Sequence, residues 1–344
     1  MGLPGEENAH ARLFAALTAP GAPFEIGERD GLPDLAIANE TRNTVSVLLN
    51  KGNGALMAAY PTGGKPKAIE AADLNGDSLP DLAVANEDTQ RVSVLLNQGG
   101  NTFAPGVQYV TPGTSPRSIL SADLNGDGAL DLAVMSRSSF LSVRLNQGNG
   151  SFGPPAYYTA GVFPSTQYVS AIAAADMNED GRIDFVVGHE AYATYQPKIG
   201  LLLNQGDGTF VYAAEHTAGV GQTAIKAADL NGDGRPDVAA ASGNNVIVLL
   251  NQGNGAMSPA VSYAVGASAN TMAMGDLNGD GVSDIAVTTS LGVRVLLNQG
   301  NGTLAPAAPY ATGTSASGLS SADLNGDGAL DLAFINPTEA GLQV

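Results

Sequence analysis

The sequence lacks cysteine and tryptophan, and only 14 % of its 344 residues are charged. The absence of cysteine excludes disulfides, thiolate zinc sites and cysteine nucleophiles. No apolar run approaches the roughly 18 residues that a membrane-spanning helix requires, so we expect no membrane insertion. The first 20 residues include Glu6, Glu7 and Arg12 and show no hydrophobic signal-peptide segment. We therefore expect any targeting segment to have been removed or never to have been present.

Basic side chains are also scarce. The chain has 15 Lys and Arg against 33 Asp and Glu, which gives a net charge of −18. Because binding to phosphate groups depends on Lys and Arg, nucleic acid is not an expected partner. The 44 Gly and 19 Pro follow no three-residue period, which excludes collagen. With 44 % hydrophobic residues the chain can bury a core, so wholesale disorder is not expected.

An internal repeat accounts for the whole chain. The string Asp-Leu-Asn-Gly-Asp-Gly-x-x-Asp, or a near copy, recurs every 47 to 53 residues, with a degenerate copy upstream at 26–34. Each copy is followed by two short apolar runs, such as 81–86 and 92–97, and then by an Asn- and Gly-rich turn. These features indicate four short strands per repeat, which is typical of a β-propeller blade. We predict an all-β, seven-bladed propeller of four-stranded antiparallel blades, forming one domain over 1–344.

The two ends of the chain suggest how the ring closes. The last copy stops at Val344, about where its third strand should finish. The segment 11–20 resembles fourth strands elsewhere, such as 208–219. We therefore expect this N-terminal strand to complete the last blade, which would remove an exposed sheet edge. The alternative is that the chain is cut from a longer array.

The repeated motif has the composition of a calcium loop. Positions one, five and nine are Asp, position three is Asn, and position seven can add its backbone carbonyl. Hard oxygen ligands in a tight Gly-containing turn suit Ca²⁺, which takes 6–8 oxygens. An EF-hand would need a bidentate Glu at position twelve, where this chain has apolar residues. The predicted ligands of about six structural ions are Asp73, Asn75, Asp77, Leu79 and Asp81; Asp123, Asn125, Asp127, Ala129 and Asp131; Asp176, Asn178, Asp180, Arg182 and Asp184; Asp229, Asn231, Asp233, Arg235 and Asp237; Asp276, Asn278, Asp280, Val282 and Asp284; and Asp323, Asn325, Asp327, Ala329 and Asp331.

Two copies depart from the pattern. The degenerate first copy keeps Glu28, Asp30 and Asp34 but has Ile26 at position one, so we expect it to be weakly occupied or empty. In the second copy Ser78 replaces the Gly at position six without removing a ligand. The alternative to calcium is that these segments are merely solvated turns with favourable Asp and Asn chemistry.

The segment "DLNGDGALDLAV", found at 123–134 and 323–334, carries a family resemblance. The chain resembles the FG-GAP/VCBS repeat family, whose best-known members include the seven-bladed propeller of integrin α subunits; a fungal lectin of similar architecture is another relative. The resemblance covers essentially the whole chain and implies calcium between the first and second strands of each blade. It does not imply a particular ligand.

Two insertions distinguish the fourth repeat. They lie between Phe152 and Asp176 and between Asp184 and Asn204, and strand parity places both on the face opposite the acidic motifs. Insertions on one face of a repeat protein are often its binding loops. The candidate ligand-binding residues are Phe163, Tyr168, His189, Tyr192 and Tyr195. The alternative is that the insertions have no binding role.

Three functions remain open on the sequence alone. The first is an extracellular or cell-surface adhesion module, stabilised by calcium, that binds a glycan or a protein. The second is a passive structural domain of a larger surface protein. The third is a polysaccharide lyase or hydrolase, for which His189, Glu190 and Lys198 form the only nearby acid–base set on that face. No nucleophile motif is present, so no catalytic residue is predicted. The extracellular location follows from the calcium supply, which is millimolar outside cells.

Overall fold

A computed structural model describes residues 11–16, 18–19, 22–23, 33–50, 55–100, 102–138, 140–159, 169–189, 198–219, 221–310, 316–336 and 341–343. Every regular element in these ranges is a β-strand. The described residues include no helix with the length and apolar character needed to cross a bilayer.

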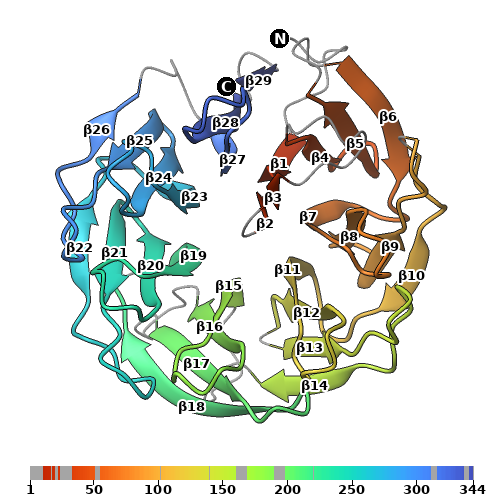
Figure 1. Cartoon of the computed structure of the whole chain (residues 1–344), viewed down its shortest axis with the longest axis horizontal. Helices are drawn as coiled ribbons and strands as arrows, with labels where there is room; N and C mark the ends of the chain where they lie inside the picture. Colours follow the sequence, from red (N-terminus) through yellow and green to blue (C-terminus); the bar gives the residue numbers. More distant parts are fainter. Residues whose placement is uncertain are drawn as a thin grey trace.

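The strands form antiparallel sheets arranged around a central axis (Figure 1). The first three sheets contain β1 (Ala11–Ala16), β4 (Leu35–Asn39), β5 (Thr44–Leu49) and β6 (Ala55–Pro61); β7 (Pro66–Ala72), β8 (Asp81–Asn86), β9 (Arg91–Leu95) and β10 (Val107–Val110); and β11 (Pro116–Ala122), β12 (Asp131–Ser136), β13 (Phe140–Arg144) and β14 (Ala156–Thr159). The next three contain β15 (Val169–Ala175), β16 (Asp184–His189), β17 (Lys198–Asn204) and β18 (Phe210–Thr217); β19 (Gln222–Ala228), β20 (Asp237–Ser242), β21 (Asn245–Leu249) and β22 (Val261–Ala264); and β23 (Ala269–Gly275), β24 (Asp284–Thr289), β25 (Gly292–Leu296) and β26 (Ala308–Pro309). The last sheet contains β27 (Ser317–Ala322), β28 (Asp331–Asn336) and β29 (Gly341–Gln343), and β2 (Thr18–Ala19) pairs with β3 (Ala22–Pro23).

The architecture is therefore a β-propeller, as predicted. The described strands form six complete four-stranded blades and one partial blade of three strands. In each blade the first strand lies next to the axis and the last lies on the outer circumference (Figure 1). We number the blades one to seven in chain order, the seventh being the partial one.

The N-terminal strand does not complete the last blade, so that prediction is wrong. β1 pairs with β4 from Ala11↔Asn39 to Ala16↔Leu35 and is the inner strand of the first blade. Nearly all of β4 is buried, so without β1 its inner edge would leave backbone amides and carbonyls unpaired inside the ring. This requirement outweighs the resemblance of 11–20 to a fourth strand.

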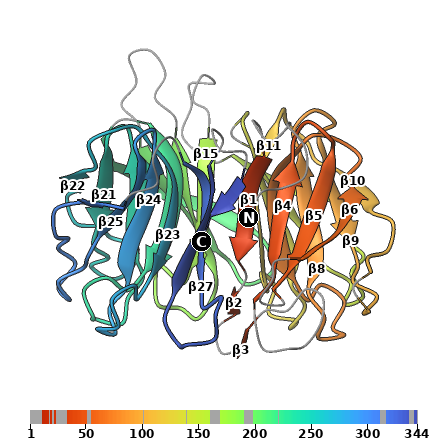
Figure 2. The same cartoon turned by 90° about the horizontal axis from the view of Figure 1, so that it is seen from above.

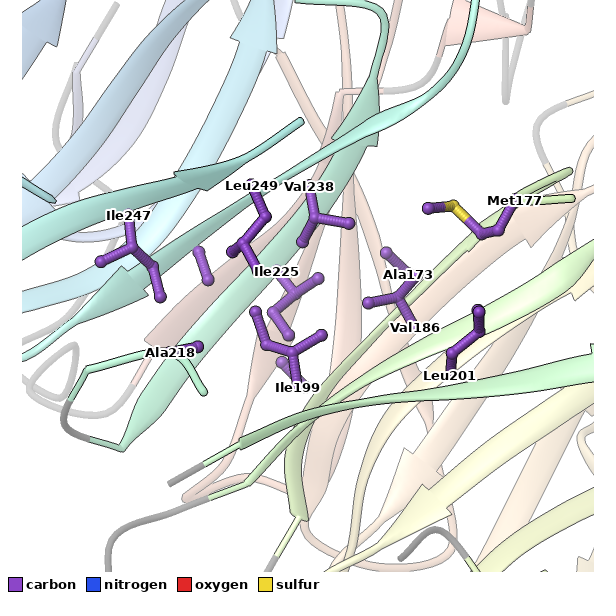
Figure 3. Packing of buried hydrophobic residues seen from close by; sticks show 12 residues of the cluster. Ala173, Met177, Val186, Ile199, Leu201, Ala218, Ile225, Val238, Ile247 and Leu249 are labelled. Carbon is purple, nitrogen blue, oxygen red and sulfur yellow. The ribbon is translucent and has the colours of Figure 1, made fainter. Parts of the chain in front are cut away.

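The second strand of each blade is the centre of its sheet. All six residues of β8, β12, β16, β20 and β24 are buried, which explains why consecutive apolar residues follow the Asp in each strand. The core lies between neighbouring blades, and Figure 3 shows one such layer between blades four and five. There Val186, Ile199 and Leu201 of blade four face Ile225 and Val238 of blade five. Each fully buried side chain of this kind contributes about 1.5–3 kcal/mol.

Tyrosines of the fourth strands link neighbouring blades at the circumference. Tyr60 packs edge-on against Phe103 of the next blade, with ring centroids 5.1 Å apart, and Tyr109 packs in the same way against Phe152 at 5.5 Å. These contacts pack the outer strand of one blade against the neighbouring blade. Tyr310 differs, since 60 % of its surface is exposed.

Candidate metal centres

The acidic motifs form loops between the first and second strands of their blades. We call the segments 73–81, 123–131, 176–184, 229–237, 276–284 and 323–331 acidic loops two to seven, after their blades. In acidic loop two, β7 ends at Ala72 and β8 begins at Asp81, and these two residues pair across the sheet. The corresponding pair recurs in the other five loops. Each loop is therefore closed at its base by the sheet ladder, with positions one to eight beyond the end of the strands.

Positions one, three and five are linked by a dense set of backbone bonds. In acidic loop two, Asp73 Oδ1 accepts from the Gly76 amide at 2.7 Å, and Asp73 Oδ2 accepts from the Ser78 amide at 2.8 Å. Asn75 Oδ1 accepts from the Asp77 amide at 3.0 Å, and Asp77 Oδ1 accepts from the Leu79 amide at 2.8 Å. Acidic loops three, six and seven repeat all four bonds within 0.2 Å. The sequence repeat is thus also a repeat of geometry.

Position six lies in the left-handed region of backbone space. Gly128 has φ 86°, and Ser78 occupies the same position of acidic loop two with φ 65°. An L-residue with a side chain is strained in this region by about 1–2 kcal/mol. Ser78 nevertheless donates its backbone N–H to Asp73 as the glycines do, so the substitution leaves the loop geometry intact.

Position nine is a buried carboxylate. Asp81 is fully buried; its Oδ2 accepts from the Leu74 amide at 2.9 Å, and its Oδ1 accepts from the Asn97 amide at 2.7 Å. Burial raises the pKa of Asp81 to about 6, against the lowering effect of the two amides, and the charges of Asp77 and Asp73 raise it further. Burial likewise raises the pKa of Asp184 to about 6. The carboxylates at one, five and nine therefore share one electrostatic neighbourhood.

The donor set of each acidic loop fits a calcium ion. It offers three carboxylates, an amide oxygen and a backbone carbonyl, with no nitrogen or sulfur ligand, which is the chemistry that Ca²⁺ selects. The described residues include no group of three or more acidic, His or Cys side chains already gathered as a metal cage. In acidic loop two, Asn75 Nδ2 instead donates to Asp77 Oδ2 at 2.9 Å. Calcium would compete with such internal bonds for the same oxygens, and would offset the mutual repulsion of the carboxylates.

The degenerate first loop keeps one feature of the others. Asp34, at its position nine, is 1 % exposed, and its Oδ1 accepts from the Asn50 amide at 2.9 Å. Glu28 and Asp30 lie outside the described residues. The weak occupancy predicted for this loop stays a prediction.

Of the five predicted ligand-binding residues, the structure describes His189 alone. Phe163, Tyr168, Tyr192 and Tyr195 fall outside the described residues. His189 is 1 % exposed; its Nδ1 lies 2.9 Å from the Lys198 carbonyl oxygen, and its backbone N–H donates to Gln222 Oε1 at 3.0 Å. His189 therefore fastens blade four to blade five and offers almost no surface to a ligand.

Of the acid–base set considered for catalysis, the structure describes His189 and Lys198. The Lys198 ammonium forms an ion pair with Glu215, and Tyr212 donates its hydroxyl to the same carboxylate at 2.9 Å. Glu190 lies outside the described residues. Lys198 is thus engaged within its own blade.

A charge network on the opposite rim escaped the sequence analysis. Lys65 and Lys67 lie 3.1 and 3.3 Å from the Glu40 carboxylate, and 3.6 and 3.7 Å from that of Glu87. Arg117 adds a contact to Glu87 at 3.8 Å, so the network joins blades one, two and three. These residues are up to 77 positions apart and belong to no motif, which is why sequence spacing gives no sign of them.

Comparison with known proteins places this geometry in a family. The profile of the FG-GAP-like repeat matches residues 28–84, 73–134, 123–187, 190–240, 229–287 and 276–334. No curated protein is significantly similar to the chain in sequence.

Solved structures with the same fold are distant in sequence. One is a lectin of Agrocybe aegerita that specifically recognises non-reducing terminal N-acetylglucosamine; it is 20 % identical, with a TM-score of 0.57, and the match covers 90 % of this chain and 83 % of the lectin. Another is BBS1N, crystallised in complex with ARL6DN; it is 16 % identical, with a TM-score of 0.61, and the match covers 96 % and 95 % of the two chains. At these identities the likeness concerns the fold alone. The repeat matches, which span most of the sequence, show that the chain belongs to the FG-GAP-like repeat family.

Proposed function

We propose that this propeller is a calcium-stabilised extracellular binding or adhesion module, which recognises its ligand through the rim opposite the acidic loops. The observation that supports this most is the recurrence of one all-oxygen loop geometry in six blades on one rim. The amides that these side chains accept could also be satisfied by Asn or Ser, whereas carboxylates at positions one, five and nine of every loop suit a shared cation.

Charge supports the metal part of the proposal. The chain carries −18, and six divalent ions would add 12 positive charges and leave −6. Loops with three carboxylates each favour opening when no cation is present. Sites of modest affinity fill where calcium is millimolar, so an extracellular or cell-surface location accompanies the proposal.

Two classes of ligand are proposed for testing. The Agrocybe aegerita lectin uses the same fold to recognise N-acetylglucosamine, which makes a glycan the first candidate. BBS1N in complex with ARL6DN motivates a protein ligand as the second. We propose no catalytic role, because His189 is buried and Lys198 is paired with Glu215. We also propose that the three-stranded sheet serves as a seventh blade closing the ring.

A glycan array in calcium, repeated in EDTA, tests the proposal directly. Binding that survives Tyr310→Ala, an exposed tyrosine on the circumference, but is lost in Tyr192→Ala/Tyr195→Ala would support recognition through the insertions of the fourth blade. Equal binding by both variants would refute that assignment. A folded, calcium-loaded chain that binds neither glycans nor surface proteins would favour the passive structural role.

A further inference from the structure

An asparagine ends or follows the third strand in each of the first six blades, and its backbone N–H donates to the acidic motif of its own blade. Asn298 donates to Asp284 Oδ1 at 2.7 Å, and Asn146 donates to Asp131 Oδ1 at 2.7 Å. The equivalent bonds are those of Asn97 to Asp81, Asn204 to Asp184, Asn251 to Asp237 and Asn50 to Asp34. Each acceptor is the carboxylate at position nine.

The side chain of the same asparagine reaches the preceding blade. Asn298 Nδ2 donates to the Leu230 carbonyl oxygen at 2.8 Å, and Leu230 is position two of acidic loop five. The equivalent bonds are those of Asn146 to Leu74, Asn204 to Leu124, Asn251 to Met177 and Asn50 to Leu324. The last of these joins the first blade to the seventh, across the two ends of the chain.

The residue at position two completes the connection, because its own N–H donates to position nine of its loop. Leu230 donates to Asp237 Oδ2 at 2.9 Å. A continuous path therefore runs from Asp284 through Asn298 and Leu230 to Asp237. Asn298 is 4 % exposed and also donates to the Ser283 carbonyl at 3.1 Å, while its Oδ1 accepts from Gly300. A buried amide with all its groups satisfied has one favoured orientation.

We propose that these asparagines are positioning residues that couple neighbouring acidic loops, so that calcium in one loop raises the affinity of the next. This inference rests on the calcium binding proposed above. An ion that fixes the carboxylate at position nine fixes the asparagine backbone, and through its side chain fixes position two of the preceding loop. Because coupling between binding sites is reciprocal, each loop of a linked pair raises the affinity of the other.

The coupling explains a residue that the degenerate first loop has kept. That loop has lost Asp at position one, yet Asp34 is still buried and bonded to Asn50, whose side chain reaches Leu324. Asp34 therefore takes part in the connection across the ring closure. Two junctions are not described by such a bond. The residue that Asn97 would reach, position two of the degenerate first loop, lies outside the described residues. Within the described residues, no asparagine side chain donates to the carbonyl of Leu277, position two of acidic loop six.

The second of these junctions gives acidic loop six one coupled neighbour and one uncoupled neighbour. Asp280→Ala removes an exposed ligand at position five of that loop. Amide hydrogen exchange of the full-length chain, measured at increasing calcium, then gives a separate midpoint for each loop. We expect the midpoint of 229–237 to rise about fivefold, the lower end of usual coupling energies. The midpoint of 323–331 should stay unchanged.

The matched substitution removes the coupling amide. In an Asn298→Leu background, Asp280→Ala should shift the midpoint of 229–237 less, whereas Gln299→Ala, an exposed neighbour, should leave the full shift. The Leu230 carbonyl still accepts from the Gly302 amide at 2.9 Å, so Asn298→Leu does not leave it unpaired. If Asn298→Leu does not fold, the comparison of 229–237 with 323–331 decides alone.

The outcomes separate the two proposals. Equal shifts in 229–237 and 323–331, or none in either, would overturn the coupling while leaving calcium binding intact. Loops whose exchange ignores calcium altogether would overturn the proposed function, and the coupling with it.

Discussion

Figure 2 shows the propeller from the side, with one rim above and the other below. The two rims differ in the contacts that join neighbouring blades. On the rim of the acidic loops, the same bonds recur from blade to blade within a few tenths of an ångström, and asparagine side chains join one blade to the next. On the opposite rim the described contacts between blades include two different kinds. Blades one to three use the Glu40–Lys67 ion network, while blades four and five use His189 and Gln222.

The difference indicates which rim can vary from blade to blade. On the rim of the acidic loops, the same hydrogen bonds recur because every blade there has the same kind of loop between its first and second strands. Where the contacts between blades differ from one junction to the next, a residue can change in one blade without disturbing the other junctions. Recognition of a particular ligand requires such local freedom.

Removing calcium should have the largest effect on the stability of the protein. A ligand present at about 100 times its dissociation constant stabilises by roughly 2.7 kcal/mol per independent site, so six sites together would dominate stability. EDTA should therefore lower the melting temperature substantially, and calcium should restore it, as calorimetry would show. A melting temperature that EDTA leaves unchanged would refute calcium binding by the acidic loops.

Substituting position nine should produce the next largest effect, even without calcium. Asp131→Ala leaves the buried amides of Leu124 and Asn146 without an acceptor, and an unsatisfied buried group costs about 1–3 kcal/mol. We expect a loss of about 2–4 kcal/mol in urea unfolding with EDTA. Asp127→Ala, an exposed position in the same loop, should cost less than about 1 kcal/mol under these conditions. Equal losses would contradict the anchoring role of position nine.

Lowering the pH should stabilise the metal-free chain and narrow the stability difference between it and the calcium-bound chain. The pKa of Asp81 and of Asp184 is raised to about 6 in the folded state, above 3.8 for the ordinary carboxyl. Between these values the folded chain binds more protons than the unfolded one, so metal-free stability rises as the pH falls from 7.5 to 5.5. Calcium needs deprotonated ligands, so its contribution shrinks over the same range. Melting curves at both pH values, with EDTA and with calcium, test this. The difference in melting temperature between calcium and EDTA should be smaller at pH 5.5. A metal-free chain with a lower melting temperature at pH 5.5 than at pH 7.5 would contradict the prediction.

The contrast between the repeating rim and the opposite rim also explains which features the sequence predicts. The acidic loops, the short strands and the packing of Tyr60 and Tyr109 repeat in register, so their periodicity reveals them. The place of β1 depends on which sheet edge would otherwise be unpaired, and residues 11–16 carry no signal that distinguishes an inner strand from an outer one. In the sequence alone, the asparagines resemble ordinary turn residues. Their bonds to the preceding blade depend on how the blades are arranged in space. Glu40 and Arg117 meet only through three-dimensional packing.

Exchanging position six between two acidic loops tests the uniformity of that rim more finely. Ser78→Gly should stabilise the chain by about 0.5–1 kcal/mol, because glycine relieves the strain at φ 65° but loses more entropy on folding. Gly128→Ser should have the opposite effect, and a Cβ at Gly128 would meet no atom within 4 Å, so the backbone angle alone is tested. Urea unfolding with EDTA measures both. Effects of the same sign would mean that the two loops are not equivalent.

The smallest effect is expected on the opposite rim, where it sharpens the comparison. Glu87 lies 3.6 Å from Lys65 and 3.8 Å from Arg117, and ion pairs near the surface contribute about 0–1 kcal/mol. Glu87→Gln should therefore lower the free energy of unfolding by less than about 1 kcal/mol. The loss should be the same with and without calcium to within about 0.5 kcal/mol, because distant sites act additively. A Glu87→Gln effect that depends on calcium would show that the two rims communicate through the blades, and the separation of stability from recognition would not hold.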